Sequence, residues 1–158
     1  MLNFGCANDI REGWVNVDVQ RGKGIISFDF NVLPYPFEDN TFELIHAENI
    51  LEHLGRPKEV LHELRRISKN NGIIEIIVPY YNNKGAFNDM EHIHYFSDNT
   101  FVDFVSGVNW VDKSIRFEII ESKLMPTNIG RFIPFRKKLS LFIGGLIAQV
   151  NVKLKVVK

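Results

Sequence analysis

The side chains that could do chemistry begin near the first residue, where a short apolar segment runs directly into a turn of small residues. Gly5 and Ala7 leave room for a ligand to lie against bare backbone, because a larger side chain there would fill that space. A second apolar segment ends on an acid, Asp18. A carboxylate at the tip of a neighbouring strand can accept two hydrogen bonds from a ribose diol. The pattern therefore indicates a site for a nucleoside at these two strand ends.

A second group of reactive side chains lies later in the chain, at Glu91, His92 and His94. Histidine is the side chain best suited to take a proton from a hydroxyl group near neutral pH. The same three residues could offer two or three ligands to a metal ion. However, His92 and His94 share a face only if this segment is a strand, and no second ligand pair is suitably spaced. We therefore expect an acid–base role and no metal.

In the first third of the chain, short strands must position these groups. Apolar residues predict strands at 1–4, 14–19 and 25–29, and the segments between them are too brief for crossover helices. Pro57 then marks the first turn of a helix, which Asn70-Asn71-Gly72 is expected to end with a left-handed cap.

The second half of the chain predicts further strands and one more helix. Residues 73–78 are typical of a buried parallel strand, which Pro79 stops. Ser97 or Asp98 is expected to cap a helix, and residues 116–120 and 150–156 predict a closing antiparallel pair. This order predicts a doubly wound α/β sheet whose first half lacks the usual helical cover.

The succession of motifs resembles the class I S-adenosylmethionine-dependent methyltransferases, in particular their small bacterial and archaeal type 11 group. Ala7 stands where that family usually has a second glycine. The stretch 87–97 is similar to the family segment after strand five, and its histidine aligns with His92. The remaining segments that carry the resemblance are Leu2–Asn8, Gly13–Asp18, Phe28–Asn31, Leu33–Phe37, Thr41–Ala47, Ile50–Leu54, Leu64–Ile67, Asn71–Gly72 and Ile73–Pro79.

The resemblance implies a Rossmann-like, mostly parallel sheet with an antiparallel last strand and S-adenosyl-L-methionine as the cofactor. Asp18 would bind the ribose, Asp29 the adenine amino group, Phe28 or Phe30 would lie against the ring, and the loop 5–8 would contact the methionine part. His92 and His94 are the catalytic candidates. The full set expected at the cofactor is Gly5, Cys6, Ala7, Asn8, Asp18, Asp29, Phe30, Ala47 and Glu48.

This resemblance favours methyl transfer to a small-molecule or saccharide acceptor, and we expect no nucleic-acid partner. The alternative is a module with the same fold that binds a nucleoside or a partner protein without turnover. Ala7 and the missing helices favour that module, whereas Asp18, Asp29 and His92 favour the enzyme. An NAD-dependent dehydrogenase is poorly supported, because the first turn lacks the full Gly-x-Gly-x-x-Gly spacing.

Length and composition are those of one domain of 158 residues, with 1–105 as the cofactor-binding core and 106–158 as closing strands and an apolar cover segment. Cys6 is the single cysteine, which excludes an intramolecular disulfide and favours a cytoplasmic location. The net charge of zero conceals a division of the charges along the chain. Residues 1–112 carry 9 basic and 17 acidic side chains, whereas residues 113–158 carry 10 and 2.

The segment 131–148 combines basic and apolar residues in a way that leaves two interpretations open. The basic cluster Arg136-Lys137-Lys138 precedes ten largely apolar residues. Such a segment could cover the sheet and shield the acceptor pocket, with the three basic residues exposed. It could also bind weakly to an anionic membrane surface. The sequence leaves the oligomeric state unknown.

Overall fold

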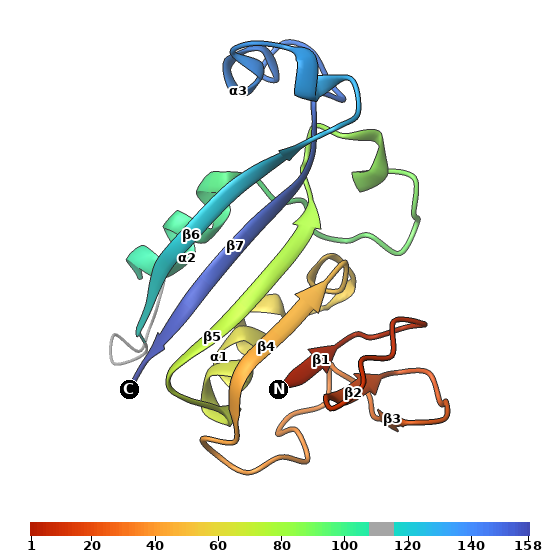
Figure 1. The fold of residues 1–158 in the computed structure, drawn as a ribbon, viewed down its shortest axis with the longest axis vertical. Coiled ribbons are helices and arrows are strands. Elements are labelled where there is room, and N and C mark those ends of the chain that lie inside the picture. The colour runs from red at the N-terminus through yellow and green to blue at the C-terminus, as the bar shows by residue number, and fades with distance from the viewer. Residues whose placement is uncertain (108–115) are drawn as a thin grey trace.

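A computed structural model describes residues 1–107 and 116–158, and its strands form one mixed sheet with the order β3-β2-β1-β4-β5-β7-β6 (Figure 1). The described strands are β1 (Leu2–Phe4), β2 (Val15–Asp18), β3 (Ile25–Ser27), β4 (Phe42–Glu48), β5 (Ser68–Pro79), β6 (Arg116–Pro126) and β7 (Ile147–Val157). The described helices and 3-10 turns are η1 (Leu51–His53), α1 (Pro57–Ile67), η2 (Lys84–Ala86), α2 (Asp98–Ser106), η3 (Gly130–Phe132) and α3 (Arg136–Leu139).

Strand directions follow the predicted pattern. The five strands from β3 to β5 are parallel to their neighbours, and β7 runs antiparallel between β5 and β6. No helix connects β1, β2 and β3, so the trimmed first half is confirmed. The carboxyl ends of β1, β2, β4 and β5 therefore meet at one edge of the sheet, where open α/β sheets bind ligands.

Helix α1 begins as expected but ends earlier. Pro57 occupies its first turn, and its apolar stripe is buried against the sheet. The chain turns extended at Ser68, whose hydroxyl donates to the carbonyl of Leu64 at 2.7 Å. The expected cap at Asn70-Asn71-Gly72 is wrong, because these residues lie inside β5. Asn71 does have a left-handed φ of 62°, but it lies where the register between β4 and β5 shifts, so it forms a bulge.

Helix α2 has the predicted start. Ser97 caps it in a capping box with Thr100, whose hydroxyl accepts from the Ser97 N–H at 3.0 Å. Gly107 ends it with a φ of 68°. Phe101 and Phe104 are buried in the core that the sheet forms with α1 and α2.

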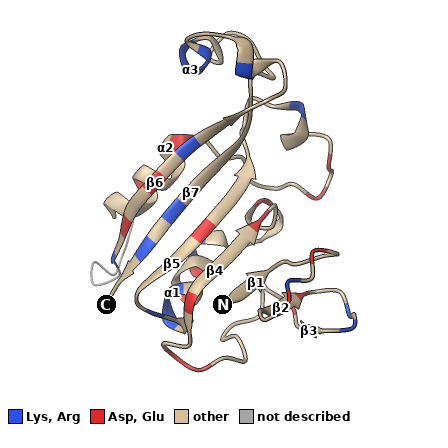
Figure 2. Ribbon diagram, viewed as in Figure 1, with Lys and Arg blue, Asp and Glu red and all other residues tan. Residues whose placement is uncertain are grey.

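The other face of the sheet carries a row of polar side chains that crosses six strands in register. Four of the five neighbouring pairs in this row are linked by a hydrogen bond or an ion pair. The Asn3 amide donates to the Asn16 side chain at 3.1 Å, His46 Nδ1 lies 3.0 Å from a Glu75 oxygen, and Lys153 Nζ lies 3.6 Å from Glu75. Figure 2 shows these charges on β5 and β7. The full row is Asn16, Asn3, His46, Glu75, Lys153 and Glu121.

The expected cover segment instead forms a tip beyond the end of the sheet, made of residues 127–146 (Figure 1). We name it the apolar tip because six of its large apolar side chains are exposed. Only three of its residues are buried, and its helix α3 has four residues, none of them buried. The segment is held by the loop after β5, where Asn82 bonds the backbone of Ser140 and accepts from Gly145 N at 2.9 Å. The exposed side chains are Ile129, Phe132, Phe135, Leu141, Phe142 and Ile143.

The basic cluster of the tip is exposed only in part. Lys137 and Lys138 are exposed, but Lys137 pairs with Asp98 at the start of α2. Arg136 is half-buried, which corrects the expectation that all three would be free in solvent. Among the described residues, no helix combines the length and apolar character needed to cross a bilayer.

Candidate functional site

The loop after β1 is folded as a tight cradle. Backbone N–H groups of Gly5 and Cys6 both donate to the carbonyl of Val17, at 3.0 and 2.9 Å. Gly5 has a φ of 75°, and a Cβ there would lie 2.8 Å from Cγ1 of Ile50. Ala7 has a φ of 40°, the left-handed conformation that glycine adopts without strain. The cradle thus requires a glycine at position 5 and holds an alanine in a strained conformation at position 7.

Asp18 closes this cradle from the neighbouring strand. One carboxylate oxygen accepts from the Ala7 N–H at 2.8 Å, and the other accepts from the Gln20 N–H at 2.9 Å. The side chain is only 6% exposed, yet each oxygen retains a second lone pair. Asp18 therefore fixes the loop and can still accept from a ligand beside it. Burial and the Asp18 charge raise the pKa of the Cys6 thiol, so Cys6 is a neutral, buried group.

The residues expected around the adenine are divided between the surface and the core. Asp29 is exposed, and its carboxylate accepts from the backbone N–H of Asn31 at 2.8 Å. Phe28 is half-buried. Phe30 is fully buried, with its ring centroid 4.2 Å from that of Phe4, so the structure corrects its expected stacking role and places it in the core.

The remaining expected cofactor residues lie at the same sheet edge. Asn8 and Glu48 are exposed there. Ala47 is fully buried, so its methyl group is part of the core and only its backbone borders the edge. Glu48 lies 3.2 Å from His46 Nε2 and belongs to the polar face as well as to the strand end.

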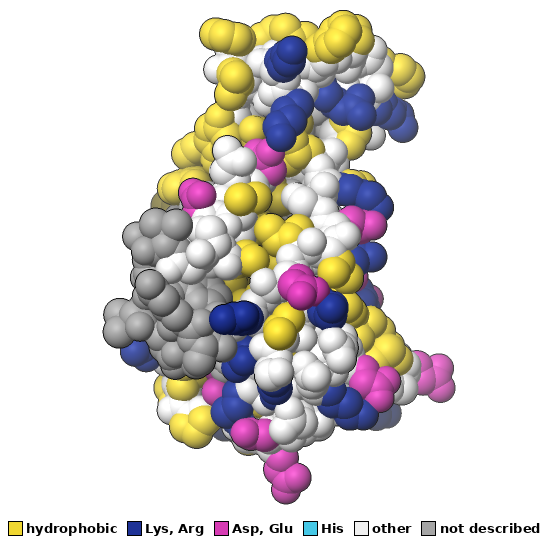
Figure 3. Space-filling model, turned by 90° about the vertical axis from the view of Figure 1, so that its left-hand side faces the viewer, with side chains coloured by type: hydrophobic (Ala, Val, Ile, Leu, Met, Phe, Trp, Pro, Cys, Tyr) yellow, Lys and Arg dark blue, Asp and Glu magenta, His cyan; other side chains and the backbone are white. Residues whose placement is uncertain are grey.

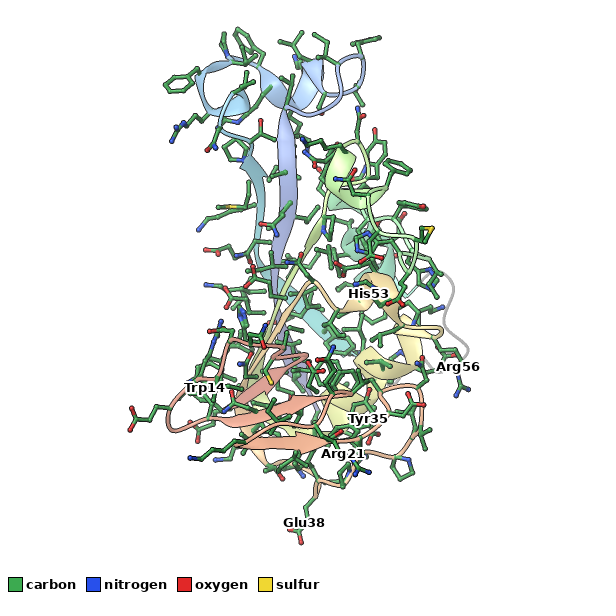
Figure 4. All side chains as sticks on the ribbon, turned by 90° about the vertical axis from the view of Figure 1, so that its right-hand side faces the viewer. Trp14, Arg21, Tyr35, Glu38, His53 and Arg56 are labelled. Atoms are coloured by element: carbon green, nitrogen blue, oxygen red, sulfur yellow. The ribbon has the colours of Figure 1, made fainter. Side chains whose placement is uncertain are left out.

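A second cluster of reactive side chains, Glu52 with His53 and His92, lies beside this edge. Glu52 is 1% exposed, and neither of its carboxylate oxygens has a hydrogen-bond partner among the described residues. Burial raises the pKa of Glu52 to about 7. His92 Nε2 lies 4.0 Å from Glu52 Oε1, and the His53 and His92 ring centroids are 4.6 Å apart. Figure 4 shows His53 next to the segment that follows β5.

The long loop after β5 is anchored to this cluster through its backbone. The N–H groups of Ile93 and His94 donate to the carbonyl of Glu52, at 2.9 and 3.2 Å. Sequence spacing paired His92 with His94, whereas the fold pairs His92 with Glu52 and His53. The missed signal was the adjacent pair Glu52-His53 directly after a strand end.

A pocket of about 340 Å³ opens beside the cluster, at the carboxyl ends of β4 and β5. His92 lines it and His94 does not. Its polar lining consists of Asn49, Glu52, Asn83, His92 and Gln149.

A larger pocket of about 660 Å³ lies between Tyr80, Asp98 and the apolar tip. The tip thus borders a pocket at this end of the sheet without covering the sheet itself.

Comparisons with known proteins agree with the resemblance seen in the sequence. Residues 6–76 match the family model described as a methyltransferase domain. An uncharacterized protein of Methanocaldococcus jannaschii is 40% identical over 67 residues, which cover 40% of this chain and 29% of that protein. The chain thus matches less than a third of the length of that relative.

Solved structures share the fold at low identity. A SAM-dependent methyltransferase of Archaeoglobus fulgidus has a TM-score of 0.65 and 16% identity, covering 98% of this chain and 84% of that one. The [4+2]-cyclase SpnF has a TM-score of 0.65 and 14% identity, covering 99% and 73%. The family model thus matches a methyltransferase domain over residues 6–76, and the solved structures show that the chain shares their fold.

Proposed function

We propose that this chain transfers the methyl group of S-adenosylmethionine to a small-molecule or saccharide acceptor. The observation that supports this proposal is that the cradle and the polar pocket lie next to each other. The cradle at Gly5 packs directly against Ile50, and Ile50 is two residues from Glu52 in the polar pocket. A donor held in the cradle would therefore border an acceptor held in the pocket.

The cofactor side needs groups that hold and align the donor. Methyl transfer is an in-line displacement at an already activated sulfonium, so alignment supplies most of the acceleration. In this proposal Asp18 accepts from the ribose diol, and Asp29 accepts from the adenine amino group. The half-buried Phe28 replaces Phe30 as the ring beside the adenine. Backbone groups of the loop 5–8 and of Ala47 and Glu48 surround the methionine part.

The acceptor side is polar, which favours a hydroxyl- or amide-bearing acceptor such as a saccharide. Five polar side chains line a space large enough for one small-molecule group. His92 is the catalytic candidate that faces this space. His94 lies outside the lining, and its backbone bond to Glu52 gives it a positioning role in the loop.

The test has two stages, binding and turnover. Calorimetric titration with S-adenosylhomocysteine should show binding, and titration with NAD should show none. Transfer of a labelled methyl group is then measured over a panel of saccharides and small hydroxyl compounds, with His92→Ala as the inactive variant. NAD binding without S-adenosylhomocysteine binding would refute the proposal.

A non-catalytic binding module is the second candidate. The strained Ala7 supports it, and so does the shared fold with a protein named as a cyclase, because the fold alone leaves the reaction open. Cofactor binding without transfer to any acceptor of the panel would favour this module.

We also propose that the apolar tip binds weakly to anionic membrane surfaces. Figure 3 shows its hydrophobic side chains gathered at one end of the molecule, with Lys and Arg side chains next to them. Phe142 is 87% exposed and Phe135 is 79% exposed, which is costly in water but favourable at a lipid interface. Each nearby basic residue adds up to about 1 kcal/mol of attraction to acidic lipid.

Co-sedimentation with phosphatidylserine vesicles tests this contact at low and high salt. We expect salt-sensitive binding that the double variant Phe135→Ser with Phe142→Ser abolishes. Ile26→Ser on β3 is the matched control, because Ile26 is also exposed but lies at the opposite end of the sheet. Absence of binding at low salt, or equal binding by both variants, would refute the membrane contact.

A further inference from the structure

Glu52 is an anomaly that requires an explanation. Its carboxylate is almost completely buried, and both of its oxygens lack a hydrogen-bond partner among the described residues. A buried polar group left without a partner costs a substantial part of its hydration free energy. Native proteins recover this cost by adding a proton, a bound water or a cation.

The neighbouring histidines are placed for a shared cation. His92 Nδ1 lies 3.0 Å from the carbonyl oxygen of Ala86, a geometry in which Nδ1–H donates to that oxygen. The other nitrogen, Nε2, then carries a lone pair toward Glu52. Such a carbonyl contact is the usual way in which a metal-binding imidazole is held in one tautomer.

The distances within the cluster are longer than hydrogen bonds and somewhat longer than the separations of ligands that share one ion, so the three side chains would have to move closer together on binding. His92 Nε2 and Glu52 Oε1 are 4.0 Å apart, which is too long for a hydrogen bond. Two atoms that each lie about 2 Å from one ion are separated by roughly 3–4 Å. One ligand atom each from Glu52, His53 and His92 lies within 4.8 Å of the other two.

The cluster is also built on firm local structure. Glu52 and His53 are adjacent on η1, which directly follows the β4 strand end. The carbonyl of Glu52 accepts from the backbone of Ile93 and His94, which holds His92 opposite the turn. Three ligands from two segments of the chain are thus brought together by backbone bonds rather than by flexible side chains.

We propose that Glu52, His53 and His92 bind one divalent transition-metal ion of the Zn²⁺, Fe²⁺ or Mn²⁺ type. One carboxylate and two imidazoles suit such ions, and three protein ligands leave a coordination position open. Glu52 and His92 also line the polar pocket, so that position faces the space that the proposed function gives to the acceptor. Given the proposed function, an acceptor oxygen bound there would be held beside the methyl donor, whereas the ion site itself does not depend on that function.

Metal binding is measured directly, without turnover. The full chain, purified in the presence of a chelator and dialysed, is titrated with Zn²⁺ by calorimetry and with Co²⁺ by visible absorption. We expect one ion per chain, with a Kd below about 10 µM. Glu52→Gln and His92→Ala should each weaken binding by about tenfold or more, and His53→Gln should change the Co²⁺ spectrum.

His94→Ala is the matched control, because His94 is the adjacent histidine of the same loop and lies outside the cluster. It should keep wild-type metal affinity. Lack of Zn²⁺ binding at about 100 µM by the wild type would overturn the proposal. So would loss of binding in His94→Ala with binding retained in His92→Ala, which would place the ligands at Glu91 and His94.

S-adenosylhomocysteine binding separates this proposal from the proposed function. Glu52→Gln that loses the ion but still binds S-adenosylhomocysteine confirms the variant as folded and supports a distinct ion site. A wild-type chain that binds S-adenosylhomocysteine but no ion would overturn the ion site and leave the proposed function standing.

Discussion

Asp18 joins cofactor recognition to the architecture of the loop, so its removal tests both. In the structure it accepts two backbone hydrogen bonds, from Ala7 and Gln20, and it borders the cradle formed by Gly5 and its neighbours. Asp18→Ala removes both bonds and the carboxylate that the proposed function aims at the ribose. The change therefore has two consequences, one for folding and one for binding.

The folding consequence follows from the environment of the two donors. A hydrogen bond to a charged group contributes about 1.5–3 kcal/mol. Ala7 and Gln20 are exposed residues, so water can replace part of this energy after the substitution. We expect a loss of about 1–3 kcal/mol in unfolding free energy, which lowers the Tm by roughly 3–10 °C in a domain of this size.

The second consequence is a loss of affinity for the cofactor product. Loss of the charge-assisted bonds to the ribose diol should weaken S-adenosylhomocysteine by about 1.5–3 kcal/mol, or roughly 10–150-fold in Kd. Calorimetric titration measures this change, and thermal unfolding is recorded in parallel. Asp9→Asn is the control, because Asp9 is an exposed carboxylate on the same loop that pairs with Arg11.

Three results would refute this reasoning. A Kd for S-adenosylhomocysteine within twofold of wild type in Asp18→Ala would show that the carboxylate does not bind the ribose. An unchanged Tm would show that its two backbone bonds do not stabilise the loop. A comparable loss of affinity in Asp9→Asn would mean that general charge, and not the position of Asp18, governs binding.

Three further substitutions test other parts of the structure. Ala7→Gly should stabilise the loop by up to about 1 kcal/mol and leave S-adenosylhomocysteine affinity equal or tighter, because glycine relieves the left-handed strain; a clear loss of affinity by calorimetry would contradict this. Gly5→Ala should cost roughly 2–4 kcal/mol in urea unfolding, because the new Cβ collides with Ile50; full stability would argue against this packing. Burial alone would raise the pKa of Glu75, but the hydrogen bond with His46, together with the charges of His46 and Lys153, outweighs it, so the pKa of Glu75 is lowered overall. The pairing therefore stabilises the fold above about pH 4.5, and this stability is lost in more acidic solution. In urea titrations, Glu75→Gln should therefore have a lower unfolding free energy than wild type at pH 7 and the same unfolding free energy in acid. A difference that stays constant with pH would be inconsistent with the pairing.

Much of the fold could be predicted because its signals are local. Apolar runs ended by Asp18 or Pro79 fixed the strand ends, and Pro57 and Ser97 marked the two helix starts. The cap at Asn71 was predicted wrongly for a physical reason. A left-handed asparagine serves equally in a helix cap or a strand bulge, and only the pairing of β5 with β4 decides between them.

The Glu52 cluster could not be predicted because it depends on the path that the loop after β5 takes past η1. Local spacing gives His94 as the neighbour of His92, but the backbone bonds to Glu52 turn the loop so that His92 faces η1. The structure of the apolar tip could not be predicted for a related reason. Its composition suits a covering helix, but Gly144 and Gly145 weaken a helix, and the tether to Asn82 directs the segment away from the sheet.

The missing helices, the polar row and the cradle are features of the same half of the sheet. Both longer helices, α1 and α2, contribute to the core on one face of the sheet, and the other face carries the polar row, of which Asn3, Asn16 and His46 are buried. Without a helix after β1, the loop cannot be fixed by a helix N-terminus. Asp18 and the carbonyl of Val17 fix it instead. A ligand that bonds Asp18 therefore acts on the support of the loop itself, so cofactor binding should protect the amides of residues 5–20 from hydrogen exchange more than those of β6 and β7.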